Sequence, residues 1–119
     1  MRFHFPNATR PKKAAKRLAA QLSLPLSTAQ RAVARACGYR DWHELNDHVH
    51  VGPPCELDTA LTSELYVNRQ VQLILAIARD IAATDAATDG DIQHALAQAR
   101  LTGDRPLRLN EQIAIRLAC

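Results

Sequence analysis

The sequence predicts an all-α protein: an N-terminal three-helix unit followed by a C-terminal bundle of about three helices. Ala and Leu, which favour helix, supply much of the 47% hydrophobic content, whereas aromatic residues contribute only 4%. Apolar residues recur at steps of three and four along most of the chain, as they do on one face of a helix. Pro and Gly interrupt these segments and indicate where the helices end.

The first helix is expected to begin near Thr9, a favourable N-cap residue, and to run through residues 12–22. Before it, Phe3 and Phe5 alternate with polar residues. This segment forms either a short extended arm that lays two rings on the core or a disordered tail.

Two capping patterns predict the next two helices. Ser27 and Gln30 have the spacing of a capping box, in which two side chains bond the free N–H groups of a helix start. Asp41 and Glu44 repeat this spacing and predict a short helix over about residues 42–48.

Three further helices are expected after the Gly-Pro-Pro break at residues 52–54. The first reads as one long helix over residues 56–84. Asp89 is expected to cap a helix over 90–101, and a last helix is expected over 110–118.

The charge is divided between the two parts of the chain. Residues 1–40 hold nine Lys and Arg and no acid, whereas residues 41–119 hold twelve acids and six bases, so charges of +9 and −6 sum to the net +3. We therefore expect a basic unit over 1–50, a linker over 51–55 and an acidic helical region over 56–119.

The long helix carries an apolar seam at alternating steps of four and three, which is typical of a helix that packs on another helix. The seam residues are Val67, Val71, Ile74, Ala78 and Ile81. Since Leu73, Leu75 and Ile77 widen this surface, the helix is either central to the fold or shared between two subunits. In the second case the segment 57–81 would mediate homodimerisation or bind a protein partner.

Residues 18–33, with the sequence LAAQLSLPLSTAQRAV, resemble the helix-turn-helix of lac-repressor-type regulators. The resemblance covers about twenty residues, and Ser23 stands where these regulators usually have Gly. It implies that the second helix enters the major groove of double-stranded DNA.

The resemblance also implies a set of DNA-contacting residues. Arg31 would bind guanine and Gln30 adenine, because each can form two hydrogen bonds with that base. The residues facing the bases would be Leu26, Ser27, Thr28, Gln30 and Arg31. Those nearer the phosphates would be Arg10, Lys12, Lys13, Lys16, Arg17 and Arg35.

A second motif, Gly-Tyr-x-x-Trp-x-x-Leu at residues 38–45, resembles one found in small helical modules of bacterial, plasmid and phage proteins. Physically, Gly38 turns the chain, and Tyr39, Trp42 and Leu45 are expected to pack the third helix onto the first two. Trp42 is interpreted as a core anchor.

The sequence gives little support for metal binding, catalysis or membrane insertion. His43, His48, His50 and Cys55 cluster in sequence without a zinc-binding spacing, so we predict no metal and no cofactor. No nucleophile elbow, phosphate loop or membrane span is present, which argues against an enzyme or a membrane protein and favours the cytoplasm.

The sequence therefore predicts a small DNA-binding protein that regulates transcription or plasmid or phage maintenance. The alternative is an interaction module, such as an antitoxin-like adaptor or a phage-encoded inhibitor of a host nucleic-acid enzyme.

Overall fold

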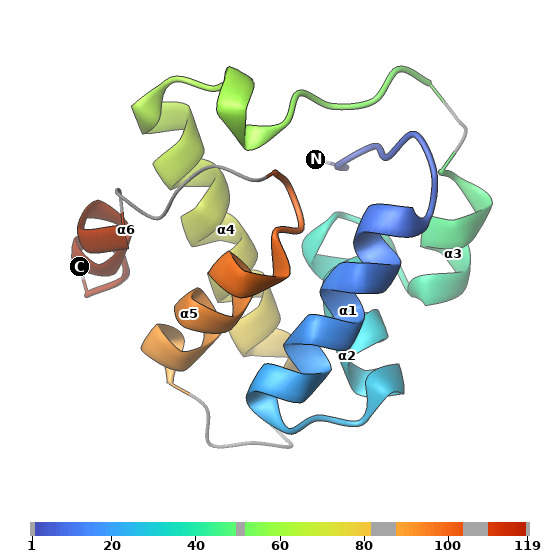
Figure 1. The fold of residues 1–119 in the computed structure, drawn as a ribbon, viewed down its shortest axis with the longest axis horizontal. Helices are drawn as coiled ribbons and strands as arrows, with labels where there is room; N and C mark the ends of the chain where they lie inside the picture. Colours follow the sequence, from blue (N-terminus) through green and yellow to red (C-terminus); the bar gives the residue numbers. More distant parts are fainter. Residues whose placement is uncertain (1, 50–51, 82–87, 104–109, 119) are drawn as a thin grey trace.

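The fold is all-α, as predicted. The computed structural model describes residues 2–49, 52–81, 88–103 and 110–118, and this part of the chain contains no strand (Figure 1). Its helices are α1 (Thr9–Leu22), α2 (Leu26–Ala36), α3 (Trp42–Asp47), the 3-10 turn η1 (Asp58–Ala60), α4 (Ser63–Ile81), α5 (Asp89–Ala99) and α6 (Asn110–Ala118).

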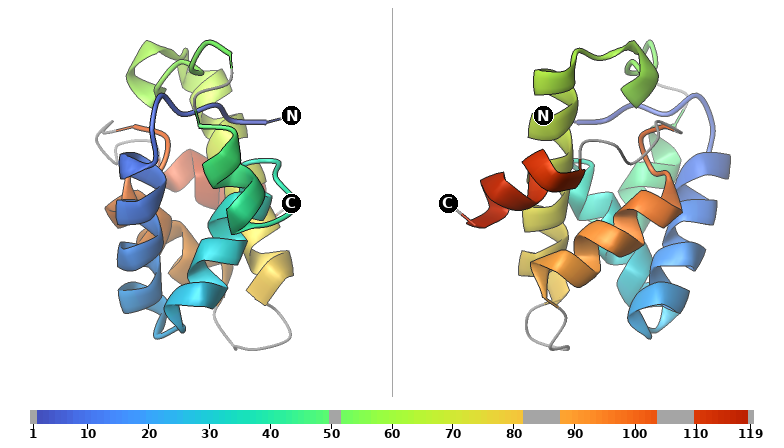
Figure 2. Two further views of the ribbon diagram at one scale, coloured as in Figure 1. Left: turned by 90° about the vertical axis from the view of Figure 1, so that its right-hand side faces the viewer. Right: turned by 60° about the vertical axis from the view of Figure 1, so that its left-hand side comes forward.

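Four of the helices form a closed ring of neighbours. α1 packs against α2 and α5, and α4 packs against the same two helices on the other side. α3 adds to the ring beside α2, and α6 lies mainly against α4 (Figure 2). The principal extents of 35 × 34 × 20 Å describe a flat molecule whose basic and acidic regions share one hydrophobic core.

The linker predicted at 51–55 falls between α3 and η1, and residues 52–57 lie outside any helix. On both sides of it, however, the helices contribute to the same core. Leu18 of α1 and Ala95 of α5 are both buried in it, as are Val33 of α2 and Ile74 of α4. The two regions of opposite charge are therefore packed as one unit.

The N-terminal segment is the extended arm, which was one of the two alternatives. Phe3 and Phe5 are buried, and their ring centroids lie 4.8 Å apart. The backbone N–H of Phe3 donates to the carbonyl of Cys37 at 2.9 Å, and the Cys55 N–H donates to the carbonyl of His4 at 3.0 Å. The arm thus ties the end of α2 to the segment before η1.

Two of the predicted N-caps are wrong. Thr9 lies inside α1, and its backbone N–H donates to the Asn7 side chain at 2.9 Å. α2 begins at Leu26 directly after Pro25, so Ser27 already lies in the first turn and no side chain caps this helix. Pro25 has the extended backbone of a helix-flanking residue, with φ −57° and ψ 145°.

The predicted cap of α3 is confirmed, whereas the predicted cap of α5 is wrong by one residue. Asp41 caps α3 as predicted, accepting the backbone N–H of Glu44 at 2.8 Å. For α5 the capping residue is Thr88, one position before the predicted Asp89. Thr88 and Asp91 form a reciprocal capping box, with N–H···O distances of 3.0 and 3.1 Å.

The long helix predicted over 56–84 begins later than expected. η1 and a break at Leu61 precede α4, which starts at Ser63; residues 82–84 lie outside the described part. Its predicted seam faces the ring itself, where Val67, Ile74 and Ile81 are each at most 5% exposed. α4 therefore uses this seam inside its own chain, packed against α2, α5 and α6.

A buried polar network secures the segments at one end of α4. Both oxygens of Asp58 accept from Thr102 Oγ1, at 2.9 and 3.0 Å, and the same carboxylate accepts from Gln70 and Arg69 at 3.1 Å. The Asp58 backbone N–H also donates to the Thr102 carbonyl at 2.9 Å. Since each buried polar group finds a partner, this network fixes η1 against α4 and the segment after α5.

Candidate nucleic-acid interface

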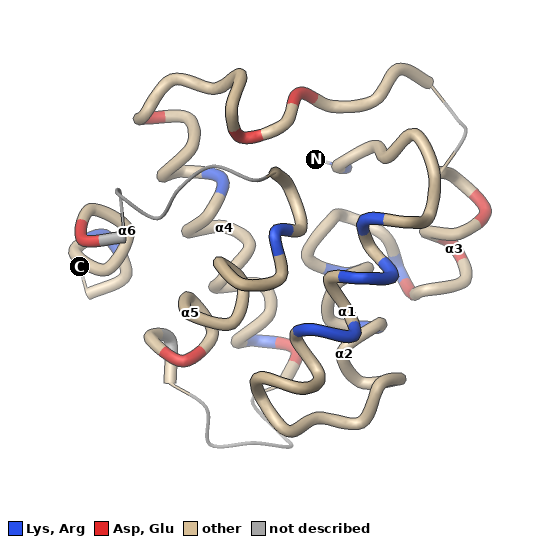
Figure 3. The backbone as a smooth tube through the Cα atoms, viewed as in Figure 1, with Lys and Arg blue, Asp and Glu red and all other residues tan. Residues whose placement is uncertain are grey.

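The exposed surface of α1 carries a cationic arc, which we define as Lys12, Lys13, Lys16 and Arg17. All four are exposed, and Figure 3 shows basic residues on successive turns of α1. At about 100° per residue the four occupy about 140° of the helix circumference. The buried residues of α1, Pro11, Ala14, Ala15, Leu18 and Leu22, occupy the opposite side.

The arc has the electrostatics of a phosphate-binding surface. Its four positive side chains point away from the core, and no ion pair with an acidic residue is present for them within the described chain. Arg10 lies at one edge of the arc, half-buried, and its Nη1 donates to the Arg100 carbonyl at 2.8 Å. An exposed helix face with this charge favours a polyanion.

The connection between α1 and α2 is a three-residue turn, as in a helix-turn-helix. Ser23 adopts φ 55° and ψ 44°, the left-handed conformation for which Gly is usual. The Ala19 carbonyl accepts from the N–H groups of both Ser23 and Leu24. Ser23 therefore adopts this conformation without Gly, at a cost of about 1 kcal/mol.

Of the residues of α2 predicted to face the DNA bases, some are exposed in the structure and others are half-buried. Leu26, at 42% exposure, and Ser27 are exposed at the N-terminal end of α2, while Thr28 and Gln30 are half-buried. α2 is packed against α1, α3 and α4, so only a narrow part of its surface is open. The exposed residues among those predicted to face the bases lie next to the turn that follows α1, and Arg35 is exposed near the other end of α2.

Arg31 and Arg35 are both held by α4. Arg31 Nε donates to Asp80 Oδ2 at 3.1 Å, and Arg35 Nη1 donates to Asp80 Oδ1 at 2.7 Å. The Asp80 side chain is only 5% exposed, whereas the Arg31 and Arg35 side chains are 41% and 53% exposed. One acidic residue of the C-terminal region thus pairs with two cations of α2, which keep a net charge of +1 with it, and leaves the arc on α1 open.

The structure adds two residues that the sequence did not indicate. Asp80 lies in α4, and its position opposite α2 depends on the α2–α4 packing. Arg100 ends α5 in the left-handed conformation, at φ 55°, and its carbonyl accepts from Arg10 of α1. Neither pairing leaves a local sequence signal, because the partners are 49 and 90 positions apart.

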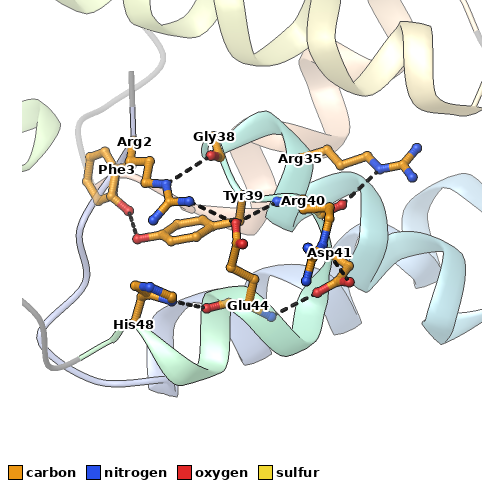
Figure 4. A network of polar contacts seen from close by, with 9 residues as sticks. All are labelled: Arg2, Phe3, Arg35, Gly38, Tyr39, Arg40, Asp41, Glu44 and His48. Atoms are coloured by element: carbon orange, nitrogen blue, oxygen red, sulfur yellow. Dashed lines mark hydrogen bonds and ion pairs between the residues drawn. The ribbon is translucent and has the colours of Figure 1, made fainter.

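The Gly-Tyr-x-x-Trp-x-x-Leu motif packs α3 onto α2, one of the two helices that it was predicted to contact. Gly38 turns the chain at φ 91°, Tyr39 and Leu45 are buried, and Trp42 packs half-buried against the core. The Tyr39 hydroxyl donates to the Phe3 carbonyl at 3.2 Å (Figure 4). The motif therefore joins α3 to the N-terminal arm.

Polar contacts surround this motif and lower two carboxyl pKa values. Glu44 Oε1 accepts from the Arg40 backbone N–H and from Arg2 Nη2, each at 2.9 Å (Figure 4). The bond from the Arg40 backbone lowers the pKa of Glu44, and the bond from the Glu44 backbone lowers that of Asp41. Both carboxyls stabilise the start of α3 in their charged form.

The histidines predicted not to bind metal make local contacts. His43 pairs with Asp47 at 3.3 Å, and His48 Nδ1 lies 2.8 Å from the Glu44 carbonyl; His50 lies outside the described residues. The described residues contain no group of three or more His, Cys, Asp or Glu that could hold a metal ion. Nor does the described part contain a helix with the length and apolar character of a membrane span.

Comparison with protein-family models, with curated proteins and with solved structures finds no match. The helix-turn-helix resemblance therefore stays a prediction.

Proposed function

We propose that this protein binds double-stranded DNA and contacts its phosphates through the cationic arc on α1. The observation that carries the proposal is the arc itself: four exposed cations on one helix face, opposite the core side. Phosphate contacts of this kind position a protein on the duplex and supply much of its affinity. The role we infer is that of a small regulator of transcription or of plasmid or phage maintenance.

Sequence reading would come from the exposed start of α2. Leu26 offers an apolar contact for a thymine methyl group, and Ser27 and Gln30 offer hydrogen bonds to base edges. These residues follow directly on the turn after α1, so a duplex lying on the arc would meet them next. Arg31 would contribute to base reading only when it leaves Asp80.

The test compares the protein with the double variant Lys12→Ala/Lys16→Ala on a fluorescent duplex at several salt concentrations. Four phosphate contacts give a slope of log K against log salt of about −3.6, and two give about −1.8. A fourfold rise in salt should therefore weaken binding about 150-fold for the native chain and about 12-fold for the variant. Arg79→Ala/Arg116→Ala removes the same charge from α4 and α6 and serves as the matched control.

Equal slopes for the arc variant and the control variant would overturn the proposal, because binding would then depend only on net charge. Absence of binding at low salt would overturn it directly. Circular dichroism of both variants checks that they are folded, which is expected because all four substituted side chains are exposed.

A second candidate function, a protein-interaction module, is favoured by the apolar side chains beside the groove between α4 and α6. Leu65 and Ile115 are 54% and 58% exposed, and Ile115 lines this groove with Val67. A homodimer or a protein partner could bury them, since exposed apolar area is typical of interfaces. Sedimentation of the native chain and of Leu65→Ser/Ile115→Ser tests this candidate: a dimer lost in the variant supports it.

A further inference from the structure

A cavity of about 620 Å³ lies beside the basic helix, in a place that the sequence did not indicate. Its walls come from the N-terminal arm, the first half of α1, the segment before η1 and the end of α5, which can be followed in Figure 1. Its volume falls within the range of small-molecule sites, roughly 300–1,000 Å³.

One wall of the cavity is cationic. Lys13 and Arg17 line it from successive turns of α1, and Arg100 lines it from the end of α5. Arg10 also borders it and donates to the Arg100 carbonyl at 2.8 Å, which holds the end of α5 against α1. The described residues that line the cavity include no Asp or Glu. An anion would therefore meet positive charge from two helices.

Another part of the lining is mainly apolar. Phe3 and Phe5 of the arm and Pro54 border the cavity, and Leu57 lies at its edge with 38% of its surface exposed. An inorganic anion would gain nothing from this wall. A ligand that carries both a ring and a phosphate would use both walls, because burying the ring removes apolar surface from water.

The site does not depend on the start of α1 as an anion-binding helix end. The Thr9 N–H already donates to Asn7 and the Lys12 N–H to the Ala8 carbonyl. The charge in the cavity comes instead from side chains that are brought together by the contact between α1 and α5.

We propose that this cavity binds a nucleotide, with the phosphate on Lys13, Arg17 and Arg100 and the base against the wall that includes Leu57. The ligand is either a free nucleoside monophosphate or the phosphorylated end of a nucleic-acid strand, since the two share this chemistry. The site shares Lys13 and Arg17 with the cationic arc, whereas Arg100 and Leu57 belong to the cavity and not to the arc.

The experiment titrates the full chain, labelled with ¹⁵N, with AMP and with inorganic phosphate, and follows amide shifts. AMP should bind saturably at millimolar or lower concentration and about tenfold more tightly than phosphate. Shifts should centre on the arm, on residues 55–57 and on the start of α1. Equal affinity for AMP and phosphate, or no saturable shift, would overturn the proposal.

Two variants, each with a matched control, test the cationic and the apolar side chains of the cavity separately. Arg100→Gln should weaken AMP and phosphate alike by about tenfold, because it removes one charged contact. Leu57→Ser should weaken AMP alone. Arg116→Gln and Leu65→Ser make the same changes on α6 and α4 and should leave both affinities unchanged. If the control variants weaken AMP binding as much as the cavity variants do, AMP does not bind in this cavity.

Binding of short single-stranded oligonucleotides distinguishes a strand end from a free nucleotide as the ligand. A strand with a 5′-phosphate that binds better than the same strand with a 5′-hydroxyl identifies a strand end, whereas binding of AMP alone identifies a free nucleotide. Because Lys12→Ala/Lys16→Ala changes only the arc, duplex binding and nucleotide binding can fail independently.

Discussion

Replacing Asp80 by Asn should release the two arginines of α2 and strengthen DNA binding. Asp80 accepts from Arg31 at 3.1 Å and from Arg35 at 2.7 Å, and its carboxylate is almost fully buried. Asn has nearly the same shape but no charge and only one acceptor oxygen. In Asp80→Asn at least one of the two guanidinium groups therefore loses its bond to residue 80, while Arg35 keeps the bond from its Nε to the Arg40 carbonyl.

The expected loss of stability is modest. Arg31 and Arg35 are 41% and 53% exposed, so each ion pair is closer to a surface pair than to a buried one. At about 0.2–1 kcal/mol for an exposed pair, the two together contribute roughly 0.4–2 kcal/mol. The melting temperature should fall by about 5 °C in a chain of this size.

The affinity for DNA should rise in this variant, although its stability falls. Two freed cations can add up to two phosphate contacts, which would make the slope of log K against log salt steeper by up to about 1.8. The assay is fluorescence anisotropy on a duplex across a salt series, combined with thermal melting. Glu64→Gln, which removes the same charge from an exposed position on α4, is the control.

The reasoning is refuted if Asp80→Asn and Glu64→Gln show the same affinity and the same slope. In that case Arg31 and Arg35 contribute nothing to the DNA surface even when Asp80 no longer holds them, and α1 alone carries the contacts.

Three further predictions concern stability. Gly103→Ala should destabilise the fold by about 3 kcal/mol in urea denaturation, because Gly103 has φ +154° and a Cβ there would lie 2.7 Å from the Asp58 nitrogen. Asp58→Ala should cost about 3–5 kcal/mol by the same measurement, since Arg69 and Gln70 lose a buried acceptor; less than 1 kcal/mol would contradict the network. Burial raises the pKa of Cys37 to about 12, so its thiol stabilises the fold below its unfolded pKa of about 9 and loses this effect between pH 9 and 12. Stability should thus fall by about 1.4 kcal/mol from pH 8 to pH 10, an effect that Cys37→Ala should abolish.

The sequence predicted the parts of the fold that depend on local pattern. The apolar spacing of α1 and α6 gave helices close to those observed, and the Asp41 cap follows from a side chain that reaches only three residues ahead. The long helix was predicted to begin several residues too early, because apolar residues continue through η1 without Pro or Gly. Thr62, whose hydroxyl accepts the Leu65 N–H at 3.3 Å, was the overlooked start signal.

The candidate site was predictable only in part. The charge of α1 and its helical spacing place the four cations on one face, and the sequence indicates both. Which face of α2 stays open depends on α4, and the pairing of these helices has no local signature. For the same reason the cavity between α1 and α5 could not be foreseen, since it depends on contacts between residues about ninety positions apart.

The ring of helices also bears on how the chain folds as it is made. α1 and α2 leave the ribosome first, yet α5, the second neighbour of α1, is made last but one among the described helices. Until then one apolar side of α1 lacks its cover, so a nascent chain would need protection from aggregation. Refolding should accordingly proceed in a single cooperative step, with no N-terminal half that melts or forms by itself.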